Sequence, residues 1–222
     1  MPYCQYAPIV SRPYQEISYI AWLEGRSDCL VVDPGLEPNL ILEYLDDQRL
    51  APVAILITHG HCDHIAGNGA LKHRWPDCPI VVGANEAEKL TDAKLNLSAA
   101  FGFPITSPPA DVLVREGDEY SAAGFDLLVR EIPGHSTGHV VYVWKAGTPP
   151  VVFGGDVLFA GSVGRTDILV GGDFGTLAAG IREKLYSLPE ETLVLPGHGP
   201  ATTIGTEQRS NPFVSSSRQP GI

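Results

Sequence analysis

The chain has 222 residues, 44% of them hydrophobic, and a mean hydropathy of +0.04. A chain of this length and composition can bury a sizeable core, and no apolar run approaches the length of a membrane span, which excludes a disordered protein and a transmembrane one. The formal net charge of -11 argues against binding of nucleic acid or of an anionic membrane, and it is compatible with a site whose carboxylates are neutralised by cations.

The N-terminal segment and the cysteines indicate a reducing compartment. Residues 1–6 show no basic segment followed by an apolar one, so we expect no signal peptide. The four cysteines form no Cys-x-x-Cys pair, and a disulfide framework is not expected in a chain of this size. We therefore expect a cytoplasmic protein. The sequence does not specify its oligomeric state.

Hydrophobic periodicity predicts an alternation of strands and helices. Strands are expected at 17–23, 29–32, 53–57, 79–83, 112–114, 125–132, 140–144, 151–153 and 192–195. Helices are expected from residue 37, from 64 to about 75, over 85–90, and from Asp173, a good N-cap, to Leu188. Gly67 and Gly69 weaken the second helix and indicate close approach of another backbone. The pattern fits one domain over residues 1–222, with a polar, frayed tail after about residue 213.

The irregular segment 91–109 separates the two halves of this pattern. It contains Gly102, Pro104, Pro108 and Pro109. Loops of this length often cover functional sites, and the sequence leaves open whether this one does.

Potential metal ligands are concentrated directly after the apolar run 53–57, in the heptapeptide THGHCDH at 58–64. His59 and His61 are two residues apart, so in extended backbone both imidazoles project to the same side, whereas Asp63 and His64 point elsewhere. One pair can hold one metal ion while the other pair reaches a second, because imidazole and carboxylate both suit zinc or iron. The alternative is a polar loop in which Asp63 caps a helix. Cys62 is interpreted as a packing residue.

Three more candidate ligands, His135, Asp156 and His198, each follow an apolar strand and a glycine. In layered α/β proteins such strand ends gather at one edge, where a crevice can hold a ligand. Seven candidate ligands are enough for two metal ions. Their positions suggest His59, His61 and His135 on one ion, Asp63, His64 and His198 on the other, and Asp156 between them.

The remaining polar candidates receive supporting roles. His73 falls on the polar side of a predicted helix and is interpreted as a surface residue. His139, which opens a strand, is interpreted as a hydrogen-bonding residue rather than a ligand. Asp33 either orients a ligand imidazole or belongs to an Asp-Pro-Gly turn.

Four motifs together resemble those of the metallo-β-lactamase superfamily, and specifically its small glyoxalase II-like hydrolases. They are THGHCDH at 58–64, PGHSTGH at 133–139, GGDVLF at 154–159 and PGHGP at 196–200. The resemblance extends from about residue 17 to 213. It implies an α/β fold, the four-layer αβ/βα sandwich, in which two mixed β-sheets lie face to face with helices on their outer faces. It also implies a dinuclear site at one edge and supports the division of ligands given above.

The resemblance further implies a metal-dependent hydrolase, most simply a thioesterase of the glyoxalase II type. Its small-molecule substrate would be S-acyl-glutathione or a related thioester or activated ester, attacked by a metal-bound hydroxide. Two divalent ions, zinc in the first place and iron or a mixed pair as alternatives, would lower the pKa of a shared water from about 15.7 towards about 7. Asp63, a ligand to one ion, would also act in catalysis by orienting the nucleophile. A thiolate leaves without a strong general acid, which favours thioesters over amides.

Comparison within the family narrows the substrate. Metallo-β-lactamases usually lack an aspartate at the bridging position, so Asp156 counts against antibiotic hydrolysis, and the nucleases carry an added domain. Glyoxalase II enzymes bind glutathione partly through a helical C-terminal extension, for which little sequence remains after His198. The segment 161–167 resembles the stretch whose basic residue meets a substrate carboxylate, which makes Arg165 a candidate substrate-binding residue. The alternative is an Arg165 paired with Asp167 or Asp173.

Two other functions are compatible with parts of this pattern. Persulfide dioxygenases resemble this fold and use one iron, which His59, His135 and Asp156 would hold as a facial triad. The complete second set of ligands favours the hydrolase. A metal that only stiffens the fold is disfavoured, because structural zinc prefers closed four-ligand sites.

Overall fold

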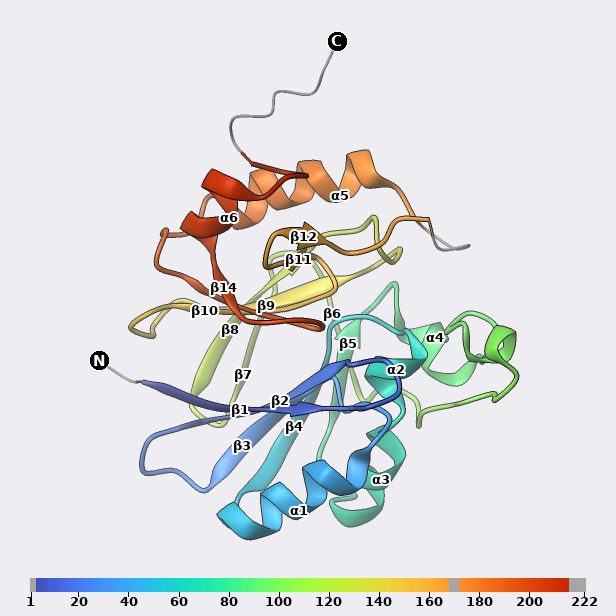
Figure 1. Cartoon of the computed structure of the whole chain (residues 1–222). Coiled ribbons are helices and arrows are strands. Elements are labelled where there is room, and N and C mark those ends of the chain that lie inside the picture. The colour runs from blue at the N-terminus through green and yellow to red at the C-terminus, as the bar shows by residue number, and fades with distance from the viewer. Residues whose placement is uncertain (1–2, 168–171, 216–222) are drawn as a thin grey trace.

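Two six-stranded β-sheets lie face to face in the computed structural model, which describes residues 3–167 and 172–215 (Figure 1). The first sheet contains, in spatial order, β1 (Cys4–Val10), β2 (Ile17–Leu23), β3 (Asp28–Val32), β4 (Ala51–Ile57), β5 (Ile80–Gly83) and β6 (Val112–Val114). The second contains β14 (Thr202–Thr203), β13 (Leu193–Pro196), β10 (Val151–Gly155), β9 (Val140–Trp144), β8 (Phe125–Glu131) and β7 (Glu119–Ala122). A separate ribbon consists of β11 (Leu158–Phe159) and β12 (Ser162–Val163).

Helices cover the outer face of each sheet. Below the first sheet in Figure 1 lie α1 (Pro38–Gln48) and α3 (Asn68–Arg74), and above the second lie α5 (Phe174–Gly180) and α6 (Ile204–Ser210). A π-helical turn, η2 (Ile181–Leu185), extends α5. Three short helices lie near the ends of the strands: α2 (Cys62–Ile65), α4 (Ala87–Thr91) and the 3-10 turn η1 (Ser98–Phe101). The αβ/βα sandwich of two mixed sheets expected from the sequence is confirmed.

The hydrophobic pattern explains this layering. Alternate residues of β9 face opposite sides: Tyr142 and Trp144 pack between the two sheets, whereas Val141 and Val143 pack under the helices of the second sheet. A third apolar cluster, which includes Ile41 of α1, lies between the first sheet and its helices. Because both faces of the central strands are covered, these strands are continuous apolar runs in the sequence.

The strand directions bring the polar segments to one edge. In the second sheet β10 runs parallel to β13, and β8 has the same direction because both β8 and β10 are antiparallel to β9. In the first sheet β3 and β4 are parallel. The segments after β4, β8, β10 and β13 carry the candidate ligands, and they meet where the two halves of the molecule face each other.

The structure contains six short or peripheral elements that the sequence did not predict, β1, β7, β11, β12, β14 and α6, and it differs from three of the stated expectations. The helix expected over 64–75 is broken into α2 and α3 at Gly67, whose Cβ, if present, would lie 2.9 Å from the carbonyl oxygen of Pro34. Gly69 faces open space, so the close approach expected there is wrong. The frayed tail expected from about residue 213 is wrong at its start, because Val214 is fully buried under the second sheet. Residues 216–222 lie outside the described residues.

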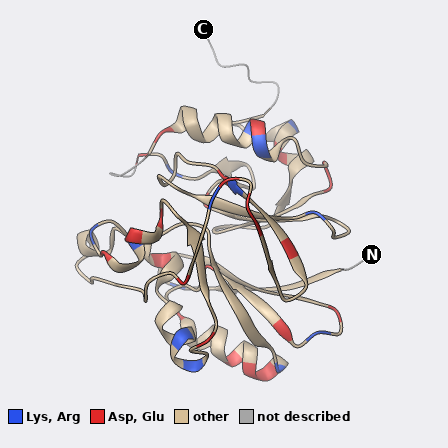
Figure 2. Ribbon diagram, turned by 180° about the vertical axis from the view of Figure 1, so that it is seen from behind, with Lys and Arg blue, Asp and Glu red and all other residues tan. Residues whose placement is uncertain are grey.

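Charged residues of both signs are interspersed on the outer helices and loops of the face shown in Figure 2. Within the described residues, no helix is long and apolar enough to cross a membrane.

Tyr142 carries a polar link between the two sheets, which gives the first prediction. Its buried hydroxyl lies on β9 and donates to the carbonyl oxygen of Ile57 on β4 at 3.1 Å. The carbonyl oxygen of Val81 on β5 also accepts from this hydroxyl, at 3.3 Å. We expect Tyr142→Phe to lower the free energy of unfolding by about 1 kcal/mol, because two buried carbonyl groups lose a donor while the ring stays in place. Urea denaturation at fixed metal loading measures this, with Tyr3→Phe, an exposed tyrosine, as the control. An unchanged midpoint for Tyr142→Phe would contradict the assigned link.

Candidate metal centre

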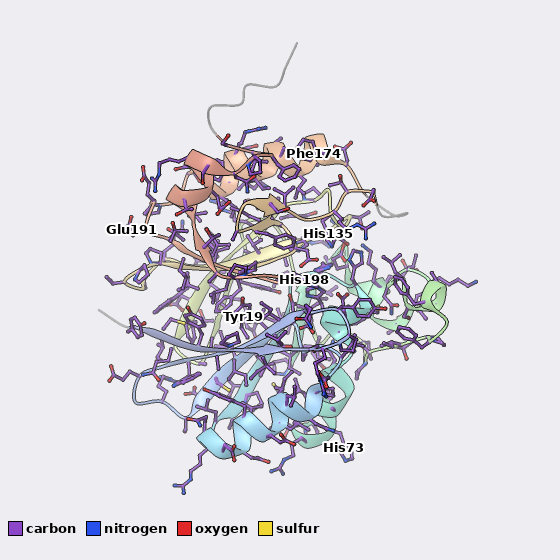
Figure 3. The ribbon with its side chains drawn as sticks, in the orientation of Figure 1. Tyr19, His73, His135, Phe174, Glu191 and His198 are labelled. Atoms are coloured by element: carbon purple, nitrogen blue, oxygen red, sulfur yellow. The ribbon has the colours of Figure 1, made fainter. Side chains whose placement is uncertain are left out.

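A cavity of about 570 Å³ opens at the edge where the two sheets meet. Its floor includes His61, Asp63, His135, Asp156 and His198. Figure 3 shows His135 and His198 close together between the two halves, and His73 far away on α3. The exposed position of His73 confirms its interpretation as a surface residue.

The first group of donor atoms consists of three imidazole nitrogens. His59 and His61 lie just after β4, and His135 follows β8 of the other sheet. The Nε2 atom of His135 lies 3.3 Å from His59 Nε2 and 3.0 Å from His61 Nδ1. Tetrahedral zinc with Zn–N bonds of about 2.0–2.1 Å places its ligand atoms about 3.3–3.4 Å apart, so three nitrogens at these separations fit one ion.

The second group combines a carboxylate with two imidazoles. Asp63 Oδ2 lies 3.7 Å from His64 Nε2 and 3.6 Å from His198 Nε2. Asp63 and His64 belong to the first turn after the strand end, where the backbone becomes helical at α2, and this turn aims them away from the first group. His198 comes from the loop after β13. These atoms too lie close enough together to hold one ion.

Asp156 lies between the two groups. Its Oδ2 is 3.5 Å from His135 Nε2 of the first group and 3.5 Å from His198 Nε2 of the second. Its Oδ1 is 3.5 Å from His64 Nε2. The structure therefore brings together all seven residues that the sequence indicated as ligands, with Asp156 in contact with both groups.

Hydrogen bonds on the far sides of the rings fix their orientation. His64 Nδ1 donates to Asp33 Oδ2 at 3.2 Å, which leaves Nε2 facing the cavity. His135 Nδ1 donates to the backbone carbonyl of Arg165 at 2.8 Å. Thr58 Oγ1 lies 3.1 Å from His59 Nδ1 and donates to Asp33 at 2.6 Å. Of the two interpretations of Asp33, the orienting role is the one that the structure shows.

Asp33 also lies close enough to His59 and His64 to form a third potential ligand group. Both of its carboxylate oxygens already accept hydrogen bonds from Thr58, one from the backbone N–H and one from the hydroxyl. We therefore assign Asp33 to support of the ligands.

The ionisation of the two groups differs. Burial and the neighbouring imidazoles lower the pKa of His59 and of His61 well below the ordinary value, so both are neutral, as metal binding requires. In the second group burial has the same tendency, but the carboxylates of Asp63 and Asp156 outweigh it and raise the pKa of His64 well above the ordinary value. Burial would raise the pKa of Asp63, but the imidazoles of His64 and His198 outweigh it and lower that pKa.

Two buried atoms of the site lack a hydrogen-bond partner among the described residues: His64 Nε2 and Asp156 Oδ1. Such groups are rare in folded proteins because each costs about 1–3 kcal/mol when unsatisfied. Gly197 confirms the crowding around them, since a Cβ at this position would lie 2.3 Å from Asp156 Oδ1. Metal-ligating atoms that converge in a confined space without hydrogen-bond partners fit the two divalent ions that the resemblance implies.

The other predicted residues fall near the site in different roles. His139 stacks on His59 and accepts a hydrogen bond from the backbone N–H of Asp156 at 3.0 Å, which confirms its hydrogen-bonding role. Cys62 is buried, and burial raises the pKa of its thiol to about 11, so it is a neutral thiol beside the ligands. The exposed side chain of Arg165 reaches the cavity wall and pairs with Asp167 at 2.9 Å.

The sequence does not assign the apolar part of the cavity wall and leaves the role of segment 91–109 open. This apolar part is formed by Tyr14, Leu97, Phe101 and Phe159. Leu97 and Phe101 belong to the irregular segment 91–109, which therefore does form part of the pocket. Leu97 has a positive φ of 72°, held in place by neighbours that hydrogen-bond within the loop, such as the Ser98 hydroxyl to Asn96 Oδ1. The proline content of the segment pointed to a loop but not to its contact with the site.

The geometry around Asp156 gives the second prediction. We expect Asp156→Ala to lower the metal content of the purified protein by half or more, because the carboxylate that contacts both donor groups is lost. Elemental analysis of protein purified without chelators measures this, and His73→Ala should retain the wild-type content. Wild-type metal content in the Asp156 variant would refute a bridging position.

Comparison with known proteins agrees with the fold. Residues 13–198 match the family described as the metallo-beta-lactamase superfamily. The chain is 44% identical over 204 residues to the probable metallo-hydrolase YqgX of Bacillus subtilis. The aligned region covers 91% of this chain and 94% of that protein. The chain is 34% identical over 206 residues to the hydroxyacylglutathione hydrolase GloC of Haemophilus influenzae, with the same coverage.

Solved structures show the same similarity. The crystal structure of the BLEG-1 B3 metallo-beta-lactamase superposes with a TM-score of 0.90 at 37% identity and covers 96% of this chain and all of that one. The structure of TTHA1623 in a di-iron-bound form superposes with a TM-score of 0.80 at 38% identity and covers 93% of this chain and 99% of that one.

Proposed function

Because this chain belongs to the metallo-β-lactamase superfamily, we propose that it is a dinuclear metal-dependent hydrolase of the glyoxalase II type. Its substrate would be S-acyl-glutathione or a related thioester or activated ester. The observation that carries the proposal is Asp156, which lies 3.5 Å from ligand nitrogens of both donor groups. Two separate groups sharing one carboxylate are suited to two adjacent cations and exceed what a single ion needs.

The proposed ligands follow the geometry. His59, His61 and His135 would hold one ion, Asp63, His64 and His198 the other, and Asp156 would bridge them. Zinc is our first choice for both, and iron is the alternative supported by the di-iron form of TTHA1623. When bound, such ions would lower the pKa of a water molecule between them towards neutrality and polarise a carbonyl oxygen.

The residues around this centre supply orientation. Asp63, partly exposed in the cavity, offers a carboxylate that can accept a hydrogen bond from the nucleophile and align it with the carbonyl carbon. The hydrogen bonds from His64 to Asp33 and from His135 to Arg165 keep two ligand rings in place during this step. A thiolate leaving group, with a parent pKa of about 8.5, departs without a proton donor. This supports a thioester rather than an amide substrate.

The cavity walls support a small molecule with an apolar and an anionic part. Tyr14, Phe101 and Phe159 provide aromatic surface, and Phe159 lies 6.2 Å from His198 between ring centroids. Arg165 provides a cation at the rim. The similarity to a hydroxyacylglutathione hydrolase is consistent with a carboxylate-bearing thiol such as glutathione in this position. The free, buried state of all four cysteines supports the proposed cytoplasmic setting.

The role of Arg165 gives the third prediction. We expect Arg165→Met to raise KM for S-lactoylglutathione about tenfold with kcat nearly unchanged, because a rim cation contributes to binding of a carboxylate and not to the chemical step. The control is Arg74→Met on α3, where an exposed arginine is paired with Asp46 far from the cavity. If KM stays at the wild-type value, Arg165 serves only its ion pair with Asp167.

The fourth prediction separates the hydrolase from the persulfide dioxygenase that shares this fold. We expect about two equivalents of zinc, or of a zinc and iron mixture, per chain after anaerobic purification, since both donor groups are complete. We also expect turnover of S-lactoylglutathione without oxygen uptake.

One equivalent of iron, with oxygen consumption on glutathione persulfide and no thioester hydrolysis, would instead establish the dioxygenase. Hydrolysis of a chromogenic cephalosporin at a rate above that of the thioester would overturn the proposed substrate in favour of a β-lactam, the activity named for the similar BLEG-1 protein.

A further inference from the structure

A buried ion pair lies directly behind the first donor group. Glu86, the residue before α4, is fully buried, and its Oε1 lies 2.9 Å from Nζ of Lys89, which is only 5% exposed. Burying two charges costs several kcal/mol each, and such pairs contribute little net stability compared with apolar residues of the same size. Because stability does not explain this buried pair, we infer its role from its contacts.

Glu86 accepts hydrogen bonds from both segments that carry the first donor group. Its Oε2 accepts from the backbone N–H of Gly60 at 2.8 Å. Its Oε1 accepts from the backbone N–H of Gly138 at 2.7 Å, and both oxygens accept from the hydroxyl of Ser136 at 2.8 Å. Lys89 also contacts the Ser136 hydroxyl. One carboxylate thus joins a loop of the first sheet to a loop of the second.

The positions of these contacts coincide with the ligands. Gly60 lies between His59 and His61 in the chain, and Ser136 follows His135. Every ligand of the first donor group is therefore adjacent in sequence to a residue that Glu86 holds. The second donor group is supported differently, by Asp33 on His64 and by backbone hydrogen bonds of Gly197 to Ile17 and Gly155.

Close packing gives the same indication independently of the hydrogen bonds. A Cβ at Gly60 would lie 2.5 Å from Cβ of Lys89, and a Cβ at Gly138 would lie 2.3 Å from Cβ of Asn85. Both loops are pressed against residues 85–89 at positions where a side chain cannot fit. Segment 85–89 therefore packs against both loops that set the separation between His61 Nδ1 and His135 Nε2, which is 3.0 Å.

We propose that Glu86 is the positioning residue of the first metal site: it fixes the distance between the His59–His61 loop and the His135 loop, and Lys89 holds its carboxylate in place. The inference rests on the proposed metal centre, but not on the identity of the substrate. It gives Glu86 and Lys89 a role that the helical pattern over 85–90 did not suggest.

The test compares metal affinities of Glu86→Gln and wild type. All the groups that face Glu86 are donors, so the amide NH2 of glutamine leaves at least one of them without an acceptor while conserving volume. We expect affinity for one of the two equivalents of zinc or cobalt(II), the one held by the first donor group, to fall about 10- to 100-fold, and affinity for the other equivalent to stay near wild type. Chelator competition with the apoprotein measures both, and the cobalt(II) absorption spectrum reports the geometry of the affected site.

Glu207→Gln is the matched control. Glu207 is another buried glutamate that accepts several hydrogen bonds, from Thr202, Gly161 and Asn211, but it does not contact the histidine loops. We expect Glu207→Gln to reduce the thermal stability of the apoprotein without changing either metal affinity. This control separates general loss of stability from loss of positioning.

Ser136→Ala provides a milder variant in case Glu86→Gln does not fold. It removes one hydroxyl that donates to Glu86, and we expect a smaller decrease in the same affinity with the spectrum shifted in the same direction. Wild-type affinity in Glu86→Gln, or an equal loss at both sites like that of a destabilised protein, would overturn the proposal. Because the measurements use metal alone, absence of thioesterase activity would refute the proposed function without affecting this result.

Discussion

Seven polar side chains from two sheets meet at one edge of the molecule, and they leave some of one another's buried polar atoms unsatisfied. On the cavity side, His135 Nε2 lies 3.3 Å from His59 Nε2 and 3.0 Å from His61 Nδ1, and among the described residues His64 Nε2 and Asp156 Oδ1 have no hydrogen-bond partner. Bringing these groups together opposes folding unless cations lie between them. The layered fold, the strand directions and the hydrogen bonds behind His59, His64 and His135 hold this assembly in place. The stability of this edge of the fold therefore depends on the groups that would bind the metal ions.

Local patterns in the sequence predicted the strands and the candidate ligands, and the resemblance of the four motifs to a known family implied the layered arrangement. Apolar runs such as 53–57 are readable as buried strands, and His135, Asp156 and His198 each follow such a run. The strands β8, β10 and β13 share a direction, which places their following residues together. The position of these residues just after a predicted strand therefore predicted their position at this edge of the fold.

What the sequence could not predict depends on contacts between distant segments. The break at Gly67 results from the carbonyl of Pro34, which no local pattern encodes. The cavity wall at Leu97 depends on a loop closed by the side chains of Asn96 and Ser98. Glu86 and Lys89, three residues apart at the start of α4, have the sequence signature of a solvent-exposed pair, yet both are buried against the ligand loops. Burial of a charged pair is visible only once the fold is known.

The hydrogen bond between His135 and the carbonyl of Arg165 links recognition to coordination. The backbone of Arg165 sets the tilt of a ligand ring at 2.8 Å, while its guanidinium extends into solvent at the cavity rim. One residue therefore supplies both the hydrogen-bond acceptor behind a candidate ligand and the cation at the cavity rim, so a shift of the backbone at this position would move both groups together.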